Sequence, residues 1–449
     1  MNSSLTQYLD LFAEARPLLD ANSCEPLNAQ RDAARQQLEV HGLPTHKVER
    51  YKYCDVEAAL APNFGLNLRR IVAAENPYER YRCNVPNLST LLYLVDGDVP
   101  VPLPEAKANV LPEGISICSL RTAATEKPEL LQAYYHQASA RTFDALTALN
   151  TLLVQDGLLV HIAKGAHVKN PVQIVSVVQG AAPIMANRRV LIVAEEGAEA
   201  TVLFCDHAFG DVQTLTTQVT EVYAAAGSHL DLLSVEETNA AATRFVNVYA
   251  EMQADARVAY NGITLNCGQS RCQMDLRLLG AGATVVANGA VVADGQQRVD
   301  NNILVDHVSA RCTSDLLFKY VLNESSVGAY AGKVLVRQDA QQTASEQTNA
   351  NLCASPEAHA YSQPMLEIYA DDVKCNHGSS IGKLDESALF YMQQRGIPLA
   401  EARLLLQHAF VNDVLQRIEL EHLRDRLSHL VEMRFRGELS KCRDCSICH

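Results

Sequence analysis

The chain has 449 residues, of which 48% are hydrophobic and 20% are charged. This composition is that of an ordinary globular protein, long enough for about two to three domains or one elongated domain with helical ends. The net charge of −14 argues against sequence-independent binding to nucleic acid, because contacts with a phosphate backbone require a positive field.

The N-terminal sequence has neither the basic segment nor the unbroken apolar run of a signal peptide. No apolar run approaches the roughly 18 residues that span a bilayer. We therefore expect a cytoplasmic protein that does not enter a membrane. Its 13 cysteines are expected to be mostly thiols, because the cytoplasm is reducing.

Residues 1–85 are predicted to form an N-terminal helical region. Leu5, Leu9 and Phe12 recur at helical spacing and give one apolar stripe. A second stripe ends at the helix-breaking residues around Gly42.

Residues 86–157 are predicted to be a mixed α/β lead-in to the core. Short apolar strands are expected around Leu91–Val95 and Ile115–Cys118. One helix is expected from Pro128 to Leu153, because apolar residues recur there at helical spacing.

Residues 158–381 change to short strands separated by small residues, with an approximate internal repeat. Four units start at Gly197, Gly227, Asp255 and Gly282, which are 30, 28 and 27 residues apart. A period of this size without intervening helices is typical of a β-solenoid, in which stacked rungs share one core. A meandering β-sandwich gives similar spacing and stays open as an alternative.

Residues 382–436 are predicted to form a C-terminal helical domain of three helices: Leu384–Gly396, Leu399–Phe410 and Val411–Met433. The third presents an amphipathic face made of Leu420, Leu423, Leu427 and Leu430 beside basic residues. This face either packs on its own domain or docks a partner protein.

Cys375 and His377 are the candidate site residues of the core. Two-residue spacing in a strand points both side chains to the same face. Thiolate and neutral imidazole are the protein groups that hold iron in sulfur clusters. A cluster usually takes about four ligands, so the remaining ones are expected from another chain. Alternatively, the pair merely packs at a subunit interface.

Residues 437–449 form a cysteine-rich tail. Cys442, Cys445 and Cys448 recur every three residues and His449 is last. This set predicts a speculative zinc or iron site. A flexible tail of free thiols and a redox role are the alternatives.

Two other patterns are assigned no chemistry. Gly328–Val334 and Gly378–Leu384 resemble phosphate-binding loops, but the glycine spacing is too short and the Mg²⁺-binding hydroxyl is missing. Hydrolysis of ATP by this chain is therefore rejected. Asp294, Asp300 and Asp306 are interpreted as turn residues.

Three stretches of the sequence resemble one protein family. The first contains Asp371–Gly378 (DDVKCNHG), Leu384–Glu386, Phe390–Tyr391 and Arg395–Ile397. The second is Phe143–Val175, and the third, weaker one is Gly42–Tyr53, where Arg50-Tyr51 replaces the usual Glu-Trp. On these residues, nearly the whole chain resembles the SufB/SufD family of iron–sulfur cluster assembly proteins, and the SufD branch in particular.

The resemblance implies a right-handed parallel β-helix core flanked by helical domains. It implies a non-catalytic scaffold that pairs with a SufB-like paralogue and, through the C-terminal helices, with a SufC-like ATPase. His377 would lie at the junction with the paralogue as a ligand or orienting group, with Cys375 beside it. The cofactor would be a transient iron–sulfur cluster shared with the partner subunit, and the chain alone would form a homodimer.

Two other functions stay open at this point. The chain resembles SufB less closely, but a SufB-type scaffold is the nearest alternative. A β-helix carbohydrate-active enzyme is the second, and it would require acidic residues grouped on adjacent rungs. The sequence leaves open the cluster type, flavin binding and the role of the tail.

Overall fold

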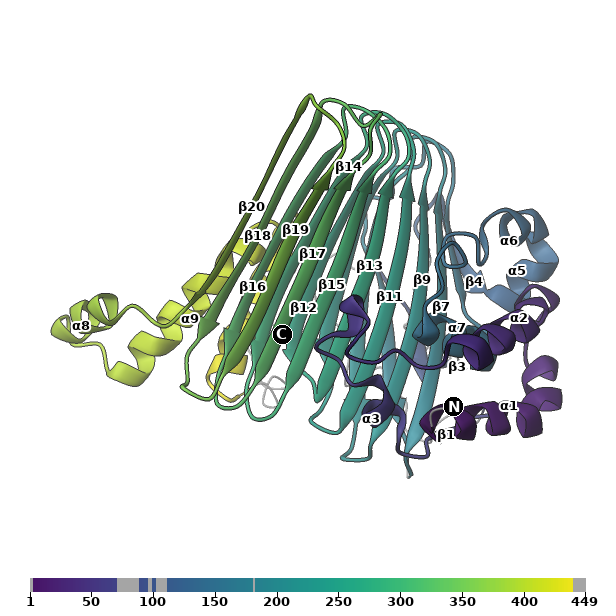
Figure 1. Cartoon of the computed structure of the whole chain (residues 1–449), viewed down its shortest axis with the longest axis horizontal. Coiled ribbons are helices and arrows are strands. Elements are labelled where there is room, and N and C mark those ends of the chain that lie inside the picture. The colour runs from purple at the N-terminus through teal and green to yellow at the C-terminus, as the bar shows by residue number, and fades with distance from the viewer. Residues whose placement is uncertain (1–2, 71–88, 96–98, 102–110, 181, 439–449) are drawn as a thin grey trace.

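Two ten-stranded sheets face each other along the length of the protein, and the chain passes from one to the other at every turn (Figure 1). The computed structural model describes residues 3–70, 89–95, 99–101, 111–180 and 182–438. Strands β5 to β20 alternate between the sheets and pair in parallel, so that they form eight rungs of a β-solenoid. The predicted parallel β-helix core with helices on both sides is confirmed, and the β-sandwich is excluded.

Among β5 to β20, the odd-numbered strands lie in sheet A, in the order β19 (His359–Ile368), β17 (Val327–Val336), β15 (Arg298–His307), β13 (Gln269–Leu278), β11 (Ala242–Met252), β9 (Thr214–Ala224), β7 (Ile184–Ala194), β5 (Leu158–Ile162), with β1 (Gly65–Leu66) beside β7. The even-numbered strands of this range lie in sheet B, in the order β20 (Val373–Gly382), β18 (Thr343–Cys353), β16 (Thr313–Leu322), β14 (Thr284–Ala293), β12 (Arg257–Asn266), β10 (His229–Glu237), β8 (Glu199–Phe209), β6 (Val172–Gln179), and β2 (Ser89–Val95) and β3 (Val99–Val101) follow β6. The remaining strand, β4 (Ile115–Ser119), pairs antiparallel with β5 in sheet A. The strands predicted near residues 91–95 and 115–118 are confirmed as β2 and β4.

The four predicted starts of the repeat are the same corner of four successive rungs. Gly197, Gly227, Asp255 and Gly282 all take a positive φ, between 56° and 78°. Each backbone N–H donates to a carbonyl of the next rung over 2.9–3.2 Å. The repeat therefore reflects one tight turn, which requires the left-handed conformation and is hydrogen-bonded from rung to rung.

Side chains that point between the two sheets form one continuous apolar core. Val305, Val334 and Tyr320 come from three different strands, and each is completely buried in it. Each rung inside the solenoid has a neighbouring rung on both sides, and these neighbours cover its inward-pointing side chains. Burial in this core therefore depends on stacking, as expected for a solenoid.

The N-terminal helices gather at one end of the solenoid and along the outer face of sheet A (Figure 1). They are α1 (Ser3–Ala21), α2 (Glu25–His41), the 3-10 turn η1 (Glu49–Tyr51), α3 (Val56–Leu60), α5 (Leu120–Glu126), α6 (Pro128–Tyr134) and α7 (Ala145–Leu153). Every residue of α7 is buried, and α7 packs on Met185, Leu215 and Phe245 of sheet A.

The prediction of one helix from Pro128 to Leu153 is wrong, because two helices occupy that range. The first helix ends at Tyr134, Tyr135 is extended, and His136 takes a left-handed φ of 58°. Its N–H donates to Glu221 Oε2 over 2.8 Å. Asp144 then caps α7 by accepting from the N–H of Thr147 over 3.0 Å. The tertiary contact with Glu221 thus overrides the helical periodicity.

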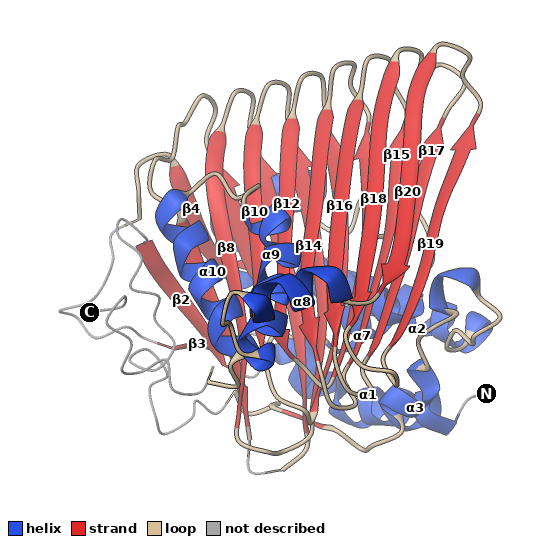
Figure 2. Cartoon of the chain, turned by 90° about the vertical axis from the view of Figure 1, so that its left-hand side faces the viewer, coloured by secondary structure: helices blue, strands red, loops and turns tan. Residues whose placement is uncertain are grey.

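The C-terminal helices are α8 (Glu386–Gln394), α9 (Leu399–Leu415) and α10 (Glu421–Phe435). Helices α9 and α10 lie across the outer face of sheet B (Figure 2). Leu423 and Leu427 are buried there, so the predicted amphipathic face packs on its own domain and is not free to dock a partner. The predicted break at residue 410 is also wrong, because α9 continues to bury Val411 and Val414. None of the described helices is long and apolar enough to cross a membrane.

Substitution of Gly289, a glycine of the core, tests how tightly the core is packed. An added Cβ at Gly289 would lie 2.3 Å from Cδ1 of Phe318. We expect Gly289→Ala to lower the free energy of unfolding by about 1–3 kcal/mol, because the Phe318 ring would have to shift within the packed core to admit the methyl group. Denaturant unfolding measures this. Gly378→Ala is the matched control, since its Cβ would meet no atom within 4 Å; an equal loss in both variants would contradict the packing account.

Candidate functional site

The last rung of the solenoid, made by β19 and β20, is open on one side. Each strand pairs with one neighbour, β17 or β18, and no described strand covers its other edge (Figure 2). Large apolar side chains are exposed there, including Ile381 at 54% and Tyr361 at 43%. An uncovered strand edge with apolar side chains is a template for pairing with another chain.

Cys375 and His377 lie on β20 and share one face, as their spacing predicts. In the parallel register, Cys375 is opposite Ser345 and His377 is opposite Gln347 of β18. Ser345 and Gln347 are buried between the sheets. Both candidate residues therefore point toward the inner side of the solenoid. We call the open end between the inner faces of β19 and β20 the mouth.

The two residues differ in burial. His377 is exposed, whereas Cys375 is half-buried and packs against the apolar core. Burial raises the pKa of the Cys375 thiol, although a hydrogen bond with the backbone of Ser345 opposes the shift. Ser379 Oγ donates to Ser362 Oγ over 2.7 Å, which ties β20 to β19 across the mouth.

A row of buried polar side chains lies directly beneath the mouth. Gln347, Asn349 and Asn351 of β18 all point inward and are no more than 2% exposed. Asn351 Nδ2 donates to Asn349 Oδ1 over 2.7 Å and to the carbonyl of Ser380 over 3.1 Å. These residues were not predicted as part of the site. Their signal is the alternation in QTNAN, which places amides opposite Leu316, Phe318 and Tyr320 of the preceding strand β16.

The described residues contain no group of three or more His, Cys, Asp and Glu side chains that would hold a metal ion. Within this part of the chain, Cys375 and His377 therefore have no third side chain of these types close enough to form such a group. The predicted tail site of Cys442, Cys445, Cys448 and His449 lies outside the described residues.

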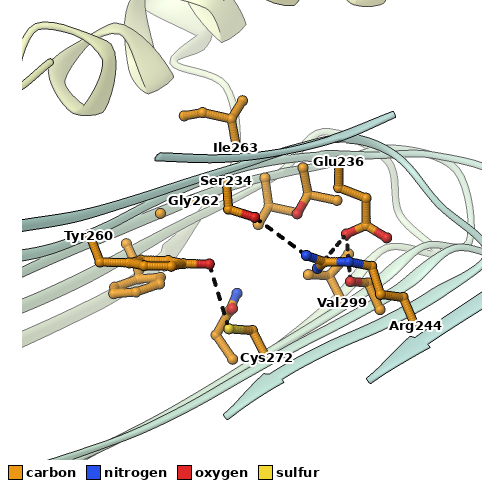
Figure 3. A pocket seen from close by; sticks show the side chains of 14 residues that line it. Ser234, Glu236, Arg244, Tyr260, Gly262, Ile263, Cys272 and Val299 are labelled. Atoms are coloured by element: carbon orange, nitrogen blue, oxygen red, sulfur yellow. Dashed lines mark hydrogen bonds and ion pairs between the residues drawn. The ribbon is translucent and has the colours of Figure 1, made fainter. Parts of the chain in front are cut away.

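Deeper in the solenoid, Arg244 and Glu236 lie side by side in the wall of a small cavity (Figure 3). The Arg244 guanidinium lies 2.6 Å from Asp206 Oδ2 and 3.5 Å from Glu236 Oε2. The adjoining cavity measures about 20 Å³, which is room for one water molecule rather than for a cofactor. Cys272 borders it, 3.8 Å from the Tyr260 hydroxyl, and burial raises the pKa of its thiol. Cys272 is thus an inert buried thiol, as expected for the scattered cysteines.

The acidic residues of β15 are not turn residues, contrary to the prediction. Asp300 and Asp306 lie within the strand and are paired with arginines of neighbouring strands. Asp306 Oδ1 accepts from Arg337 Nε over 2.7 Å. Six residues along a strand separate the two carboxylates by about 20 Å. That is beyond the roughly 5–10 Å between the acids of a glycosidase, so this pair does not favour carbohydrate chemistry.

The N-terminal segment Gly42–Tyr53 runs along the outer face of sheet A toward the last rung. Arg50 Nε donates to Asn302 Oδ1 over 3.0 Å. The Tyr53 ring stacks on the Tyr361 ring of β19 with centroids 4.6 Å apart. The segment that resembles the family's N-terminal motif therefore supports the outer face of β19.

Comparison with known proteins agrees with this architecture. The family model described as "SUF system FeS cluster assembly, SufBD core domain" matches residues 177–410, and the "SufBD protein N-terminal region" matches residues 2–174. The chain is 26% identical over 406 residues to the iron–sulfur cluster assembly protein SufD of Escherichia coli K12, covering 90% of this chain and 92% of the relative. It is 24% identical over 354 residues to SufD of Bacillus subtilis, covering 78% of this chain and 80% of the relative. A SufBD family protein of Synechocystis is 26% identical over 421 residues, 90% of both chains. This chain belongs to the SufBD family of iron–sulfur cluster assembly proteins and is similar to SufD.

Proposed function

We propose that the chain is a non-catalytic scaffold subunit that holds a nascent iron–sulfur cluster at a seam with a SufB-like paralogue. The observation that carries this proposal is the open last rung with an imidazole and a thiol on its inner face. The relatives named SufD are cluster assembly proteins, which supports the same cargo.

The seam with the paralogue is proposed at β19 and β20. The uncovered strand edges supply backbone hydrogen-bonding groups, and exposed Ile368 and Ile381 supply apolar surface. A paralogue with the same solenoid would present a similar open rung. When the paralogue is absent, a second copy of this chain would occupy the same place.

His377 is the proposed iron ligand, and Cys375 is its neighbour of secondary role. The exposed imidazole is accessible to a second protein, whereas Cys375 is half-buried and its thiol is harder to deprotonate. Iron binding to Cys375 would have to displace this proton, because the thiolate is the ligand. A site divided between two proteins releases its cluster when they move apart.

Docking of a SufC-like ATPase is proposed at α8 rather than at α10. The leucines of α10 are used internally, but Phe390 and Tyr391 of α8 are 63% and 60% exposed. The Arg395 guanidinium lies 5.2 Å from the centre of the Tyr391 ring. Exposed aromatic residues beside an arginine are typical anchors of a protein interface. ATP hydrolysis by that partner would supply the energy for moving the seam.

We propose that the protein works in the reducing cytoplasm, where its 13 cysteines would be kept mostly as thiols. The tail residues Cys442, Cys445, Cys448 and His449 are retained as a separate proposed metal site, distinct from the seam.

We expect His377→Ala to reduce cluster formation by about tenfold or more, because the cluster loses a ligand. The measurement is iron and acid-labile sulfide in the anaerobically purified complex with paralogue and ATPase. Lys374→Ala is the matched control, since Lys374 lies on the outward face of the same strand. An assembled His377→Ala complex that forms clusters at the unaltered rate would refute the assignment.

Two surface variants separate the two interfaces. We expect the Ile381→Lys variant to lose the paralogue but to keep the ATPase. We expect the Phe390→Lys variant to lose the ATPase but to keep the paralogue. Each substitution would bury a charge in one of the two proposed interfaces. Co-purification of the three proteins measures both, so each variant controls the other. Loss of the same partner in both variants would mean that the interfaces are misplaced.

The alkylation rate of Cys375 should rise about tenfold per pH unit between roughly pH 7 and pH 9, because its raised pKa keeps the thiol protonated. Mass spectrometry of the peptide containing Cys375 measures this in the folded chain. The same peptide from the urea-unfolded chain should react faster at each pH. A rate in the folded chain that levels off below about pH 8 would contradict the burial effect.

A further inference from the structure

Gln347 lies directly beneath the proposed iron ligand. It is opposite His377 in the register of β18 and β20, and both side chains point inward. Neighbouring strands are about 4.8 Å apart, so the two side chains lie within reach of a hydrogen bond. His377 is exposed at the mouth, whereas Gln347 is completely buried.

The orientation of the Gln347 amide follows from its partner on the opposite sheet. Its Nε2 donates to the backbone carbonyl of Gly332 over 3.0 Å. A carbonyl only accepts hydrogen bonds, so the atom that contacts Gly332 must be the nitrogen. The oxygen is therefore on the other side of the amide. This Oε1 atom is buried and has no hydrogen-bond partner among the described residues.

A second buried polar group lies close to the same glycine. A Cβ on Gly332 would meet the Tyr330 hydroxyl at 2.5 Å and Gln347 Nε2 at 2.6 Å. The absence of a side chain at Gly332 therefore leaves space for both. The Tyr330 hydroxyl also lacks a partner among the described residues. The amide oxygen has two lone pairs, so it can accept a hydrogen bond from a donor on the side of the mouth.

We propose that Gln347 is a positioning residue that accepts a hydrogen bond from one ring nitrogen of His377. This bond selects one tautomer and leaves the other ring nitrogen directed to the seam as the iron ligand. Histidines that bind metals usually donate their second ring N–H to an oxygen acceptor, which fixes the tautomer. The inference rests on the proposed function of His377, but the proposed hydrogen bond does not require a cluster.

The test is the tautomeric state of His377 in the full-length chain labelled with ¹⁵N-histidine. Ring ¹⁵N chemical shifts are recorded at about pH 8, where a free imidazole is neutral, and His377→Gln assigns the signals. Gln347→Met removes the amide acceptor at nearly constant size, and Gln347→Glu keeps an oxygen acceptor. Glu346→Leu is the matched control, because Glu346 is exposed on the outward face of the same strand.

We expect one dominant tautomer in the unaltered chain, in Gln347→Glu and in Glu346→Leu. In Gln347→Met the two ring nitrogen shifts should move to those of an unconstrained imidazole that exchanges between both tautomers, and cluster loading in the complex should fall about tenfold. An unchanged tautomer in Gln347→Met, or a mixture in the unaltered chain, would overturn the proposal. Thermal unfolding checks the fold, and Gln347→Leu replaces the methionine variant if that variant does not fold.

The outcome separates the two proposals. If His377→Ala builds clusters normally while Gln347→Met still changes the tautomer, the iron-binding role fails and the hydrogen bond stands. If His377→Ala loses the clusters while Gln347→Met changes neither tautomer nor loading, the iron-binding role stands and Gln347 is only a packing residue.

Discussion

The stacking of rungs is the constraint on which the rest of the structure depends. A rung of two strands exposes its whole inner face unless another rung lies above and below it. Within the solenoid this condition is met, and residues such as Tyr320 and Tyr330 are completely buried. At β19 and β20, a neighbouring rung lies on one side only. The rule that builds the core therefore also leaves inward-pointing Cys375 and His377 accessible at the last rung.

The outer faces of the solenoid are covered separately. Helix α7 packs on sheet A, and α9 and α10 pack on sheet B. The N-terminal segment extends this cover to β19 through the stacked rings of Tyr53 and Tyr361. Because the outer faces have their own cover, the open end is where the inner core stays uncovered by any described strand. The exposed apolar residues of β19 and β20 lie at the same end.

Features set by local sequence were predictable, and features set by distant contacts were not. The turn residues Gly197, Gly227, Asp255 and Gly282 predicted the rungs, because a left-handed corner needs residues that tolerate it. Spacing also predicted that Cys375 and His377 share a face, but not that this face points inward. The helix break at His136 depends on Glu221, which lies 85 residues away. Asp300 and Asp306 were predicted to be turn residues because their pattern alone does not reveal their ion pairs. The arginines that pair with them lie on neighbouring rungs, far away in the sequence. The leucine pattern of α10 fits a face that binds a partner as well as a face that packs on its own domain. The contact with sheet B, which buries these leucines, shows that the second arrangement occurs.

The most direct test of the account is pulsed EPR of a reduced cluster assembled on the complex, with ¹⁵N-histidine introduced into this chain alone. If His377 binds the cluster iron across the seam, as proposed, the nitrogen hyperfine coupling changes from the ¹⁴N to the ¹⁵N pattern. A spectrum that is insensitive to labelling of this chain would contradict the central claim.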